Sequence, residues 1–249
     1  MSEFGLIGYH AAGSLSPALF RAAYGGRWPY EIIEEEDFDK AFKRFIEGDF
    51  RAVNVTAPHK KSAADAADRR SPEVGCIGAA NILVKGQDGL VEAYNSDCSA
   101  VRLLVEDLPD VTTAVVVGLG GAGRAALYAC TQCGYKTSFL HHDELSDGLC
   151  ADLVIYTLPV GIEGIAGLTV EDFQGEDRYE SSRPGKVLLE ANYKTPAFGS
   201  GDTVLKMQEG GCQYVPGRRW HLYQALTGYS LMTGEQPDFG AMLKESMNG

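Results

Sequence analysis

The chain has 249 residues, and its 34 acidic side chains outnumber its 22 lysines and arginines, giving a formal net charge of −12. An apolar fraction of 45% with 22% charged residues is ordinary for a globular protein and excludes an intrinsically disordered one. The 30 glycines follow no three-residue period, so a collagen-like protein is excluded too. No stretch concentrates lysine and arginine, and basic pairs such as Lys60-Lys61, Arg69-Arg70 and Arg218-Arg219 are isolated. Nucleic acid, whose binding requires a basic face, is therefore not an expected partner.

No segment of the sequence predicts export or membrane insertion. The first residues, MSEFGLIGYH, carry no basic start, and no window approaches the roughly 18 consecutive apolar residues of a membrane span. Of the six cysteines only Cys130 and Cys133 lie close together, with no second Cys or His pair at a metal-ligand spacing. We expect buried free thiols in place of a zinc or redox site, no bound metal, no membrane partner and a cytoplasmic protein.

The first half of the chain predicts an alternation of short strands and helices. Strands are expected over 4–9, 30–33 and 52–55, and helices over 17–24, over 37–47 and from Pro58. A hairpin over 78–97 turns at 87–89, and a helix follows over 99–107. The 37–47 helix is amphipathic, with an apolar face formed by Phe38, Phe42, Phe45 and Ile46.

After Pro109 the pattern becomes that of a parallel sheet buried on both faces. The run 111–117 is rich in β-branched residues, and a glycine-rich turn and a helix to about Cys133 follow it. Further strands are expected over 137–140, 153–156 and 187–189, and a mainly helical segment over 219–248. Strands that alternate with helices predict a doubly wound α/β fold. We therefore expect an α/β protein of two lobes, residues 1–98 and 99–218.

The glycine-rich turn, Gly118-x-Gly120-x-x-Gly123, follows a buried strand and opens a helix, as a dinucleotide-binding fingerprint requires. The first glycine permits the tight turn, the second lets the backbone approach a pyrophosphate, and the third allows close packing of helix on strand. The helix N-terminus offers unpaired N–H groups to phosphates. The alternative is a tightly packed corner without a ligand. The candidate cofactor-binding residues are Gly118, Gly120, Gly121, Ala122 and Gly123.

The second strand of this lobe should end at the ribose of the cofactor, where an acidic residue favours NAD and an arginine favours NADP. The sequence there is His141-His142-Asp143, without arginine. Asp143 favours NAD, whereas His142 and its neighbour leave NADP open. Only residues 142–151 separate this strand from the next, close to the minimum for a crossover helix. We expect an abbreviated crossover between the second and third strands of a Rossmann-like domain.

Two serines in the first lobe are candidates for anion binding. Ser14 and Ser16 are two residues apart, so their hydroxyls face the same way on an extended chain. Ser16 also stands where a helix N-cap belongs, with Pro17 at the first helical position. The simple interpretation is that cap, and the functional one adds a carboxylate held at the helix N-terminus.

A second segment places lysines where structure alone does not favour them. Thr56 is a credible N-cap and Pro58 lies in the first helical turn, which puts Lys60 and Lys61 near the positive end of the helix dipole. That end disfavours cations, so a purely structural lysine would more often lie at the other end. We expect Lys60 to be the functional lysine and Lys61 a solvated surface charge.

Polar residues also interrupt the predicted hairpin at both of its ends. Asn81 precedes its first strand, and Asp97 follows its second. Either could be a simple turn-former. Together they supply an amide for substrate hydroxyls and a carboxylate that could pair with Lys60.

The order of these motifs along the chain resembles the shikimate dehydrogenase family. The matching segments are G-S-x-S-P at 13–17, N-V-T-x-P-x-K at 54–60, G-A-x-N at 78–81, N-S-D at 95–97, G-x-G-G-A-G at 118–123 and a late Tyr and Gln. The likeness extends from about Gly5 to Gly234, and the segment from Asn54 to Lys60 is its most specific part.

The resemblance implies an NADP-linked reduction of 3-dehydroshikimate to shikimate in aromatic amino acid biosynthesis, with NAD as the other cofactor to consider. The family's catalytic lysine falls on Lys60 and its partner aspartate on Asp97. Its substrate contacts fall on Ser14, Ser16, Thr56, Asn81, Tyr193 and Gln224. The resemblance also implies that 1–98 is the substrate-binding domain, with helices 219–249 packed back on it, and that 99–218 is the dinucleotide-binding domain. A monomer or homodimer is expected.

The sequence departs from the family pattern at several positions. Gly13 stands where the family has His, Ser96 where it has Thr, Ala100 where it has Gly, and Glu190 where it has Asp. The Asn-Arg-Thr that grips the NADP 2′-phosphate is absent near 141–143. Two alternatives therefore stay open. One is an NAD-linked dehydrogenase of quinate or another cyclic polyol acid, and the other is a ligand-binding protein with an impaired cofactor site.

Overall fold

The computed structural model describes residues 3–141, 151–159, 165, 167–173, 186–199 and 201–248. The chain forms two compact units. Unit 1 contains Met1–Ser99 and Leu222–Gly249, and unit 2 contains Ala100–His221. The boundaries fall inside two helices, α5 (Ser96–Val105) and α9 (Gly217–Thr233), so each of these helices belongs in part to both units.

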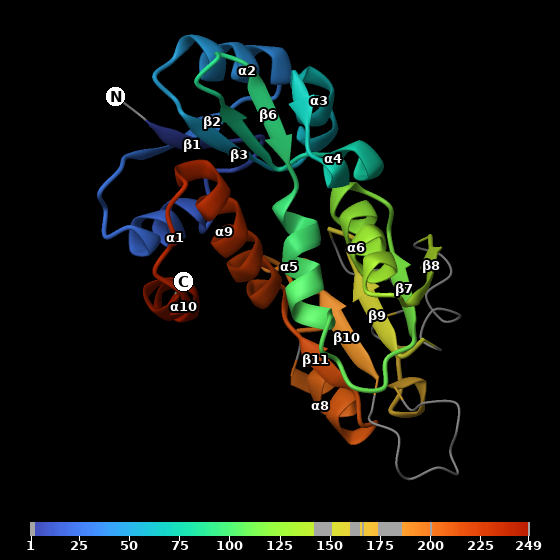
Figure 1. The fold of residues 1–249 in the computed structure, drawn as a ribbon. Coiled ribbons are helices and arrows are strands. Elements are labelled where there is room, and N and C mark those ends of the chain that lie inside the picture. Colours follow the sequence, from blue (N-terminus) through green and yellow to red (C-terminus); the bar gives the residue numbers. More distant parts are fainter. Residues whose placement is uncertain are drawn as a thin grey trace. The chain divides into compact units, whose positions relative to one another are not determined.

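Unit 1 is built on a six-stranded sheet with the order β2-β1-β3-β5-β6-β4 (Figure 1). The strands are β1 (Phe4–Gly8), β2 (Tyr30–Glu34), β3 (Ala52–Val55), β4 (Arg69–Arg70), β5 (Ile82–Lys85) and β6 (Val91–Tyr94). β1 is parallel to β2 and β3, β5 is antiparallel to both β3 and β6, and β4 is parallel to β6. The carboxyl ends of β1, β3 and β6 therefore meet the amino end of β5 at one edge of the sheet.

Helices cover both faces of this sheet, because alternate strand residues point to opposite sides. Val53 and Val55 of β3 join one apolar cluster with α2 (Phe38–Glu47), α3 (Lys60–Ala66) and α4 (Pro72–Ile77). Ala52 joins another with α1 (Ser16–Ala23), α9 and α10 (Phe239–Asn248). Each cluster excludes water from its face, so unit 1 is a three-layer α/β structure.

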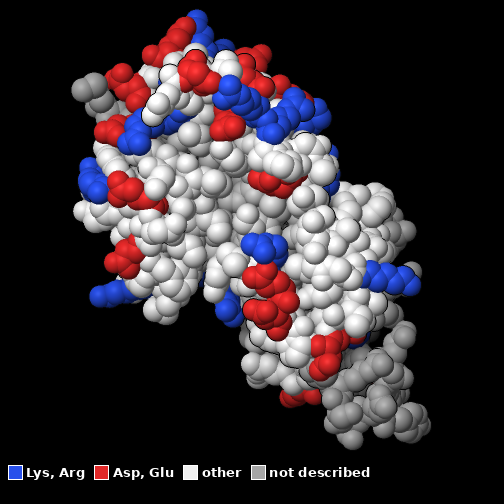
Figure 2. All heavy atoms as spheres, viewed as in Figure 1, with Lys and Arg blue, Asp and Glu red and all other residues white. Residues whose placement is uncertain are grey.

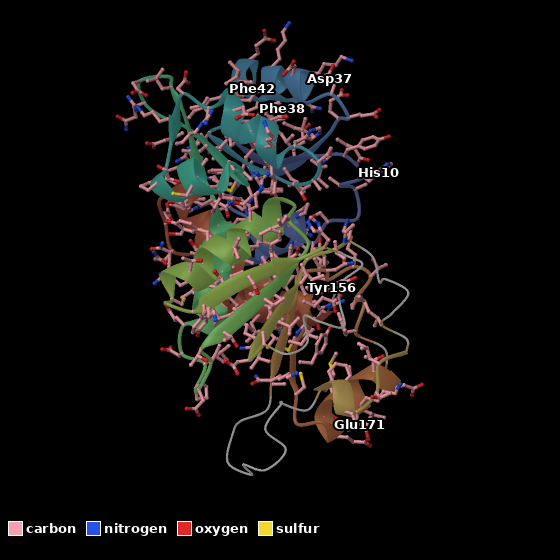
Figure 3. The ribbon with its side chains drawn as sticks, turned by 90° about the vertical axis from the view of Figure 1, so that its right-hand side faces the viewer. His10, Asp37, Phe38, Phe42, Tyr156 and Glu171 are labelled. Carbon is pink, nitrogen blue, oxygen red and sulfur yellow. The ribbon has the colours of Figure 1, made fainter. Side chains whose placement is uncertain are left out.

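Helix α2 is amphipathic as predicted, but fewer of its apolar side chains are buried than the sequence predicts. It begins at Phe38, where the Asp37 carboxylate accepts hydrogen bonds from Asp39 N and Lys40 N (Figure 3). Phe38 and Phe45 are buried, and Phe42 packs against them partly buried. Ile46 is 42% exposed, so its predicted place in the core is wrong. It follows Phe45 by one residue, which turns its side chain about 100° away from the buried stripe.

The helix starts near the candidate residues differ from the predicted ones. Ser16 is the first residue of α1, and Leu15 is its N-cap. Thr56 is not the cap of α3, because its N–H still bonds to Ile7 O beside β1, and the helix begins only at Lys60 with His59 as N-cap. Helix α5 begins at Ser96, three residues before the predicted start, because the Asn95 carboxamide accepts a hydrogen bond from Cys98 N and caps it.

Unit 2 is a parallel five-stranded sheet with the order β11-β10-β9-β7-β8. The strands are β7 (Thr113–Val117), β8 (Lys136–Leu140), β9 (Leu153–Tyr156), β10 (Val187–Glu190) and β11 (Gln213–Val215). Helix α6 (Gly121–Gln132) packs on β7, β8 and β9, while α8 (Gly201–Glu209) contributes Met207 to the apolar cluster on the other face. A short 3-10 helix, η2, spans Glu171–Phe173. The predicted doubly wound α/β architecture is confirmed.

Strand β8 is the outer strand of the sheet in the part of unit 2 that is described. The next strand along the chain, β9, lies on the opposite side of β7. The predicted abbreviated crossover spans residues 142–151, of which 142–150 lie outside the described residues. Strands β4 and β11 and helices α4 and α8 were not expected from the sequence, because short elements carry too few residues for a clear periodicity.

Surface charges in unit 1 are mostly arranged in pairs of opposite sign. Lys61 bonds to Asp65 at 2.6 Å and Arg69 to Asp88 at 2.8 Å. On the face drawn in Figure 2, lysine and arginine side chains lie among aspartates and glutamates, without a continuous basic surface. Within the described residues, no helix is both long and apolar enough to span a bilayer.

Candidate active site

The candidate site of unit 1 lies at the sheet edge where four strand ends meet. Thr56 directly follows β3, Asn81 directly precedes β5 and Asn95 directly follows β6. Backbone hydrogen bonds fix their register, from Val55 N to Asn81 O at 2.8 Å and from Asn81 N to Tyr94 O at 3.1 Å. Residues separated by about forty positions in the sequence are thereby brought side by side, at the edge where open α/β sheets bind ligands.

Lys60 and Asp97 form an ion pair at this edge. Lys60 opens α3 and Asp97 lies in the first turn of α5, and the Lys60 Nζ to Asp97 Oδ2 distance is 2.7 Å. The Asp97 side chain is 7% exposed and that of Lys60 is 19% exposed. A nearly buried ion pair gains little net stability, because desolvation offsets the attraction. The pair instead places a proton donor and acceptor where a bound molecule can reach the partly exposed ammonium.

Asn81 holds a hydrogen-bond network that joins α5 and α9. Its Oδ1 accepts from Ser96 N at 2.7 Å, and its Nδ2 donates to Ser96 Oγ at 3.0 Å and to Gln224 Oε1 at 3.4 Å. Asn81 and Ser96 are buried, whereas Gln224 is partly exposed. The apolar stripe of α9 left open whether Gln224 faces water or the site, and this bond places it in the site. Ser96 is a member that sequence reasoning missed.

The two candidate serines contact each other and α9. Ser14 Oγ donates to Ser16 Oγ at 3.0 Å, and Ser16 N donates to Ser14 Oγ at 3.2 Å. The buried Tyr229 hydroxyl donates to Ser16 O at 2.8 Å. The serine loop is therefore fixed to the helix that also carries Gln224. Ser14 remains partly exposed, whereas Ser16 is buried.

A glycine that the sequence analysis did not single out brings the loop after β1 close to Thr56. A Cβ atom on Gly8 would lie 2.4 Å from Thr56 Cγ2 and 3.1 Å from Ala11 Cβ. Only glycine permits this approach. His10, in the same loop, has a φ of 55° and is exposed (Figure 3). The sequence signal that could have pointed to Gly8 was a second glycine near the end of the predicted first strand.

Burial raises the pKa of the Cys98 thiol, next to Asp97, to about 12. Its Sγ donates to Asn95 O at 3.0 Å, and it stays protonated at neutral pH. Burial likewise raises the pKa of Cys130 to about 12, while Cys133 has a raised pKa for the same reason. Neither Cys98 nor the Cys130–Cys133 pair therefore offers a reactive thiolate. Of the cysteines that are described, Cys76 is exposed, against the expectation that the free thiols are buried.

The glycine turn of unit 2 is shaped by backbone contacts. Gly118 has a φ of 92°, and a Cβ there would lie 2.8 Å from Leu158 Cδ2. A Cβ on Gly123 would lie 2.0 Å from Gly118 O, whereas one on Gly120 would meet nothing within 4 Å. The first and third glycines are thus needed for packing, and the second faces open space at the N-cap of α6. Arg124 directly follows Gly123 in α6, and its Nε is buried without a hydrogen-bond partner among the described residues.

This turn fits a dinucleotide. The exposed Gly120 leaves room for a phosphate beside the backbone. Gly121, Ala122 and Gly123 form the first turn of α6, and the N–H groups of a helix N-terminus can bind anions. His141, after β8, is exposed and its ring lies 6.0 Å from that of Phe139. His142 and Asp143, which the sequence places at the ribose, lie outside the described residues.

Tyr193 lies in the loop after β10, which hydrogen bonds to the Glu190 carboxylate hold in place. The buried Glu190 carboxylate accepts hydrogen bonds from Ala197 N, from Phe198 N at 3.4 Å and from the Tyr214 hydroxyl at 2.7 Å. Burial and the neighbouring Glu190 raise the pKa of Tyr214, so its hydroxyl stays a donor. Glu190 thus has a structural role where the family has Asp. Tyr193 itself packs its ring against His221.

Part of unit 1 matches a known family. Residues 6–83 match the family model described as the shikimate dehydrogenase substrate binding domain. A curated shikimate dehydrogenase (NADP(+)) of Anaeromyxobacter sp. (strain K) is 32% identical over 256 residues, covering 93% of this chain and 91% of the relative. The chain belongs to the shikimate dehydrogenase family. A quinate/shikimate dehydrogenase (NAD(+)) of Corynebacterium efficiens is 28% identical, covering 96% of this chain and 95% of the relative.

Solved structures of this family share the fold. The shikimate 5-dehydrogenase of Thermus thermophilus, in complex with NADP(H) and shikimate, has a TM-score of 0.81 at 25% identity and covers 100% of this chain and 99% of its own. A quinate dehydrogenase of Corynebacterium glutamicum, in complex with NAD, has a TM-score of 0.79 at 21% identity and covers 99% of this chain and 98% of its own. The family resemblance that the motifs indicate is confirmed.

Proposed function

We propose that this protein catalyses the reversible, nicotinamide-linked reduction of 3-dehydroshikimate to shikimate. The observation that carries the proposal is the Lys60–Asp97 ion pair, 2.7 Å long and nearly buried, at the sheet edge where Thr56, Asn81 and Gln224 also lie. The assignment also draws on the relatives, one named for NADP and shikimate and one for NAD and quinate or shikimate.

The pair acts in proton transfer. In the direction of shikimate oxidation, the reacting hydroxyl gives its proton to Lys60 while hydride leaves the same carbon. Asp97 accepts the hydrogen bond from Lys60 Nζ, orients the amine and stabilises the ammonium that forms. In the reduction, Lys60 returns the proton to the carbonyl oxygen. A nicotinamide bound at the glycine turn supplies the hydride chemistry that no side chain has.

The remaining polar side chains of unit 1 bind and orient the substrate. Ser14 and Ser16 are assigned to its carboxylate, since their hydroxyls lie together at the N-terminus of α1. Asn81, Thr56 and Gln224 are assigned to its ring hydroxyls, because each side chain ends at the same sheet edge. In unit 2 Tyr193 is assigned a further substrate contact. Fixing the substrate in this way supplies the positioning that a two-reactant step needs.

The cofactor is assigned to the turn Gly118, Gly120, Gly121, Ala122 and Gly123 of unit 2. His142 and Asp143 are assigned to the adenosine ribose. This makes residues 1–99 with 222–249 the substrate-binding part and 100–221 the dinucleotide-binding part.

The test is an assay of shikimate and quinate against NADP and NAD, followed by the absorbance of the reduced nicotinamide. We expect turnover of shikimate. Lys60→Ala should lower kcat by about 10²- to 10⁴-fold, the usual contribution of a general acid–base group, with KM nearly unchanged. Lys61→Ala is the matched control, since Lys61 is 71% exposed and should leave turnover intact. Absence of turnover with every pair, or a Lys60→Ala variant with normal kcat, overturns the proposal.

The second candidate is an NAD-linked dehydrogenase of quinate. One observation favours it: β8 and the residues after it, 136–143, contain no arginine for a 2′-phosphate. In the same assay it predicts a higher kcat/KM for quinate than for shikimate and for NAD than for NADP.

A further inference from the structure

The buried side chain of Tyr229 joins helix α9 to the start of α1 within unit 1. Its hydroxyl donates to Ser16 O at 2.8 Å, and its ring packs edge-on against Phe20, with the ring centroids 5.0 Å apart. Ser16 and Phe20 are four residues apart in α1, so they lie on the same face of the helix. Tyr229 therefore contacts α1 at the turn that directly follows the serine loop.

The position of the serine pair depends on this turn. Ser14 Oγ donates to Ser16 Oγ at 3.0 Å and accepts from Ser16 N at 3.2 Å. The N-cap of α1 is Leu15, whose side chain carries no acceptor for the free N–H groups of the first turn. The start of the helix is thus held partly from outside, by the bond from Tyr229. A displacement of Ser16 would move Ser14 with it.

The same stretch of α9 lies tightly against α5, next to the amide network of the site. A Cβ on Gly228, the residue before Tyr229, would lie 3.0 Å from Ser96 Oγ. The interior of a helix disfavours glycine, and here its missing side chain lets α9 approach Ser96 closely. One turn earlier, Gln224 Oε1 accepts from Asn81 Nδ2 at 3.4 Å. Helix α9 is thereby fixed to the network at one end of the site and to the serine loop at the other.

We propose that Tyr229 is a positioning residue, which holds the serine pair at the distance from Asn81 that the substrate spans. The inference rests on the proposed function, in which the serines bind the substrate carboxylate and Asn81 a ring hydroxyl. A cyclic substrate cannot adjust the spacing between these groups, so the protein must hold its own contacts at that spacing. Gln224 and Tyr229 are five residues apart, about 7.5 Å along the helix axis, and each is bonded to one of the two groups.

The experiment compares Tyr229→Phe with Tyr24→Phe in the shikimate assay. Tyr24 is the C-cap of α1, and its hydroxyl lies 2.8 Å from Thr233 Oγ1 of α9. Both variants lose one hydroxyl that joins the same two helices, but only Tyr229 lies beside the serine loop. We expect Tyr229→Phe to raise KM for shikimate about three- to ten-fold, the contribution of one hydrogen bond, with kcat little changed. Tyr24→Phe should leave KM unchanged.

A double-mutant cycle shows whether the effect passes through the serines. The variant with both Ser14→Ala and Ser16→Ala should itself raise KM. In that background Tyr229→Phe should add almost nothing, because the hydroxyls that it positions are absent. An unchanged KM in Tyr229→Phe, an equal rise in Tyr24→Phe, or a full further rise in the serine-free background overturns the proposal. A normal KM in the serine-free variant removes the pair from the substrate site and overturns it as well.

A wild-type protein without turnover overturns the proposed function, and the positioning role is then decided by hydrogen exchange. The amides of Ser14 and Ser16 are both hydrogen-bonded, to Ala11 O and to Ser14 Oγ. They should exchange faster in Tyr229→Phe than in Tyr24→Phe, because only the first variant releases the start of α1. Equal exchange rates in the two variants overturn the positioning role without reference to any substrate.

Discussion

The polar sheet edge of unit 1 that carries Lys60 and Asp97 and the glycine turn of unit 2 are made in opposite ways. The first is a set of side-chain groups, of which Lys60 and Asp97 pair at 2.7 Å and Asn81, Ser96 and Gln224 share hydrogen bonds. The glycine turn is instead shaped by backbone atoms. At two of its glycines a Cβ would collide with neighbouring atoms.

The two regions therefore differ in the kind of substitution that disrupts them. In the unit 1 site, an isosteric substitution that alters one atom removes a charge or a donor and leaves the shape intact. In the glycine turn, the addition of one methyl group alters the shape and leaves every charge intact. Chemistry and stability should therefore respond separately in the two regions.

The largest expected effect is on catalysis in unit 1. Asp97→Asn keeps the shape of the side chain but removes the charge that stabilises the Lys60 ammonium. We expect kcat to fall by about 10²- to 10⁴-fold, while circular dichroism stays that of the native fold. Asp88→Asn, at an exposed carboxylate paired with Arg69, serves as control and should keep full activity. A normal kcat in Asp97→Asn would remove the ion pair from the mechanism.

Gly123→Ala should have the next largest effect, on stability rather than chemistry. The added Cβ would lie 2.0 Å from Gly118 O, a backbone atom that cannot move without distorting β7 and α6. We expect a loss of about 3 kcal/mol in the free energy of unfolding, at the upper end of overpacking costs. Urea titration followed by circular dichroism measures it. A variant as stable as the wild type would show that the turn can open at little cost.

Gly120→Ala tests whether the second glycine of the same turn serves cofactor binding and not stability. A Cβ there meets nothing within 4 Å and the φ is −66°, so the free energy of unfolding should change by less than about 0.5 kcal/mol. The methyl group would nevertheless stand where the backbone approaches a pyrophosphate, and KM for the cofactor should rise several-fold. An unchanged cofactor KM would place the pyrophosphate elsewhere. A large loss of stability would show that Gly120 is structural like Gly123.

The smallest expected effect concerns Asp152, which lies before β9. One oxygen of its carboxylate accepts hydrogen bonds from the backbone N–H and the hydroxyl of both Thr112 and Thr113. Burial acts to raise the pKa of Asp152, but these four bonds outweigh it and lower the pKa below its ordinary value. Because the folded pKa is the lower one, the stabilisation is present at neutral pH and is lost as pH falls through the folded pKa.

Asp152→Asn should therefore destabilise the protein at pH 7. Its difference from the wild type should begin to shrink below about pH 4, near the unfolded pKa of an aspartate, and should be lost as the pH falls through the lower folded pKa. Urea titrations of both proteins across this range measure the difference. A difference that does not depend on pH would mean that the hydrogen bonds, and not the charge, carry the stabilisation.

The sequence alone determined the elements and the chemically distinctive residues. The period of apolar residues predicted most of the strands and the longer helices, because local burial repeats every two or 3.6 residues. Lys60 was singled out because the positive end of a helix dipole disfavours a lysine, and Asp97 and Asn81 because polar groups stand at both ends of the predicted hairpin. The glycine spacing predicted the turn after β7, because only glycine tolerates the geometry at Gly118 and Gly123.

Only the tertiary structure decided which of these residues meet. The caps predicted at Ser16 and Thr56 were wrong. Ser16 already lies inside α1, and at Thr56 the bond from its N–H to Ile7 O, between distant segments, competes with the local start of α3. Gln224 was ambiguous because its helix face is polar whether it meets water or Asn81, 143 residues away. The contact between Tyr193 and His221 left no local pattern at all. Such contacts depend on how whole layers pack, and no short window of sequence contains that information.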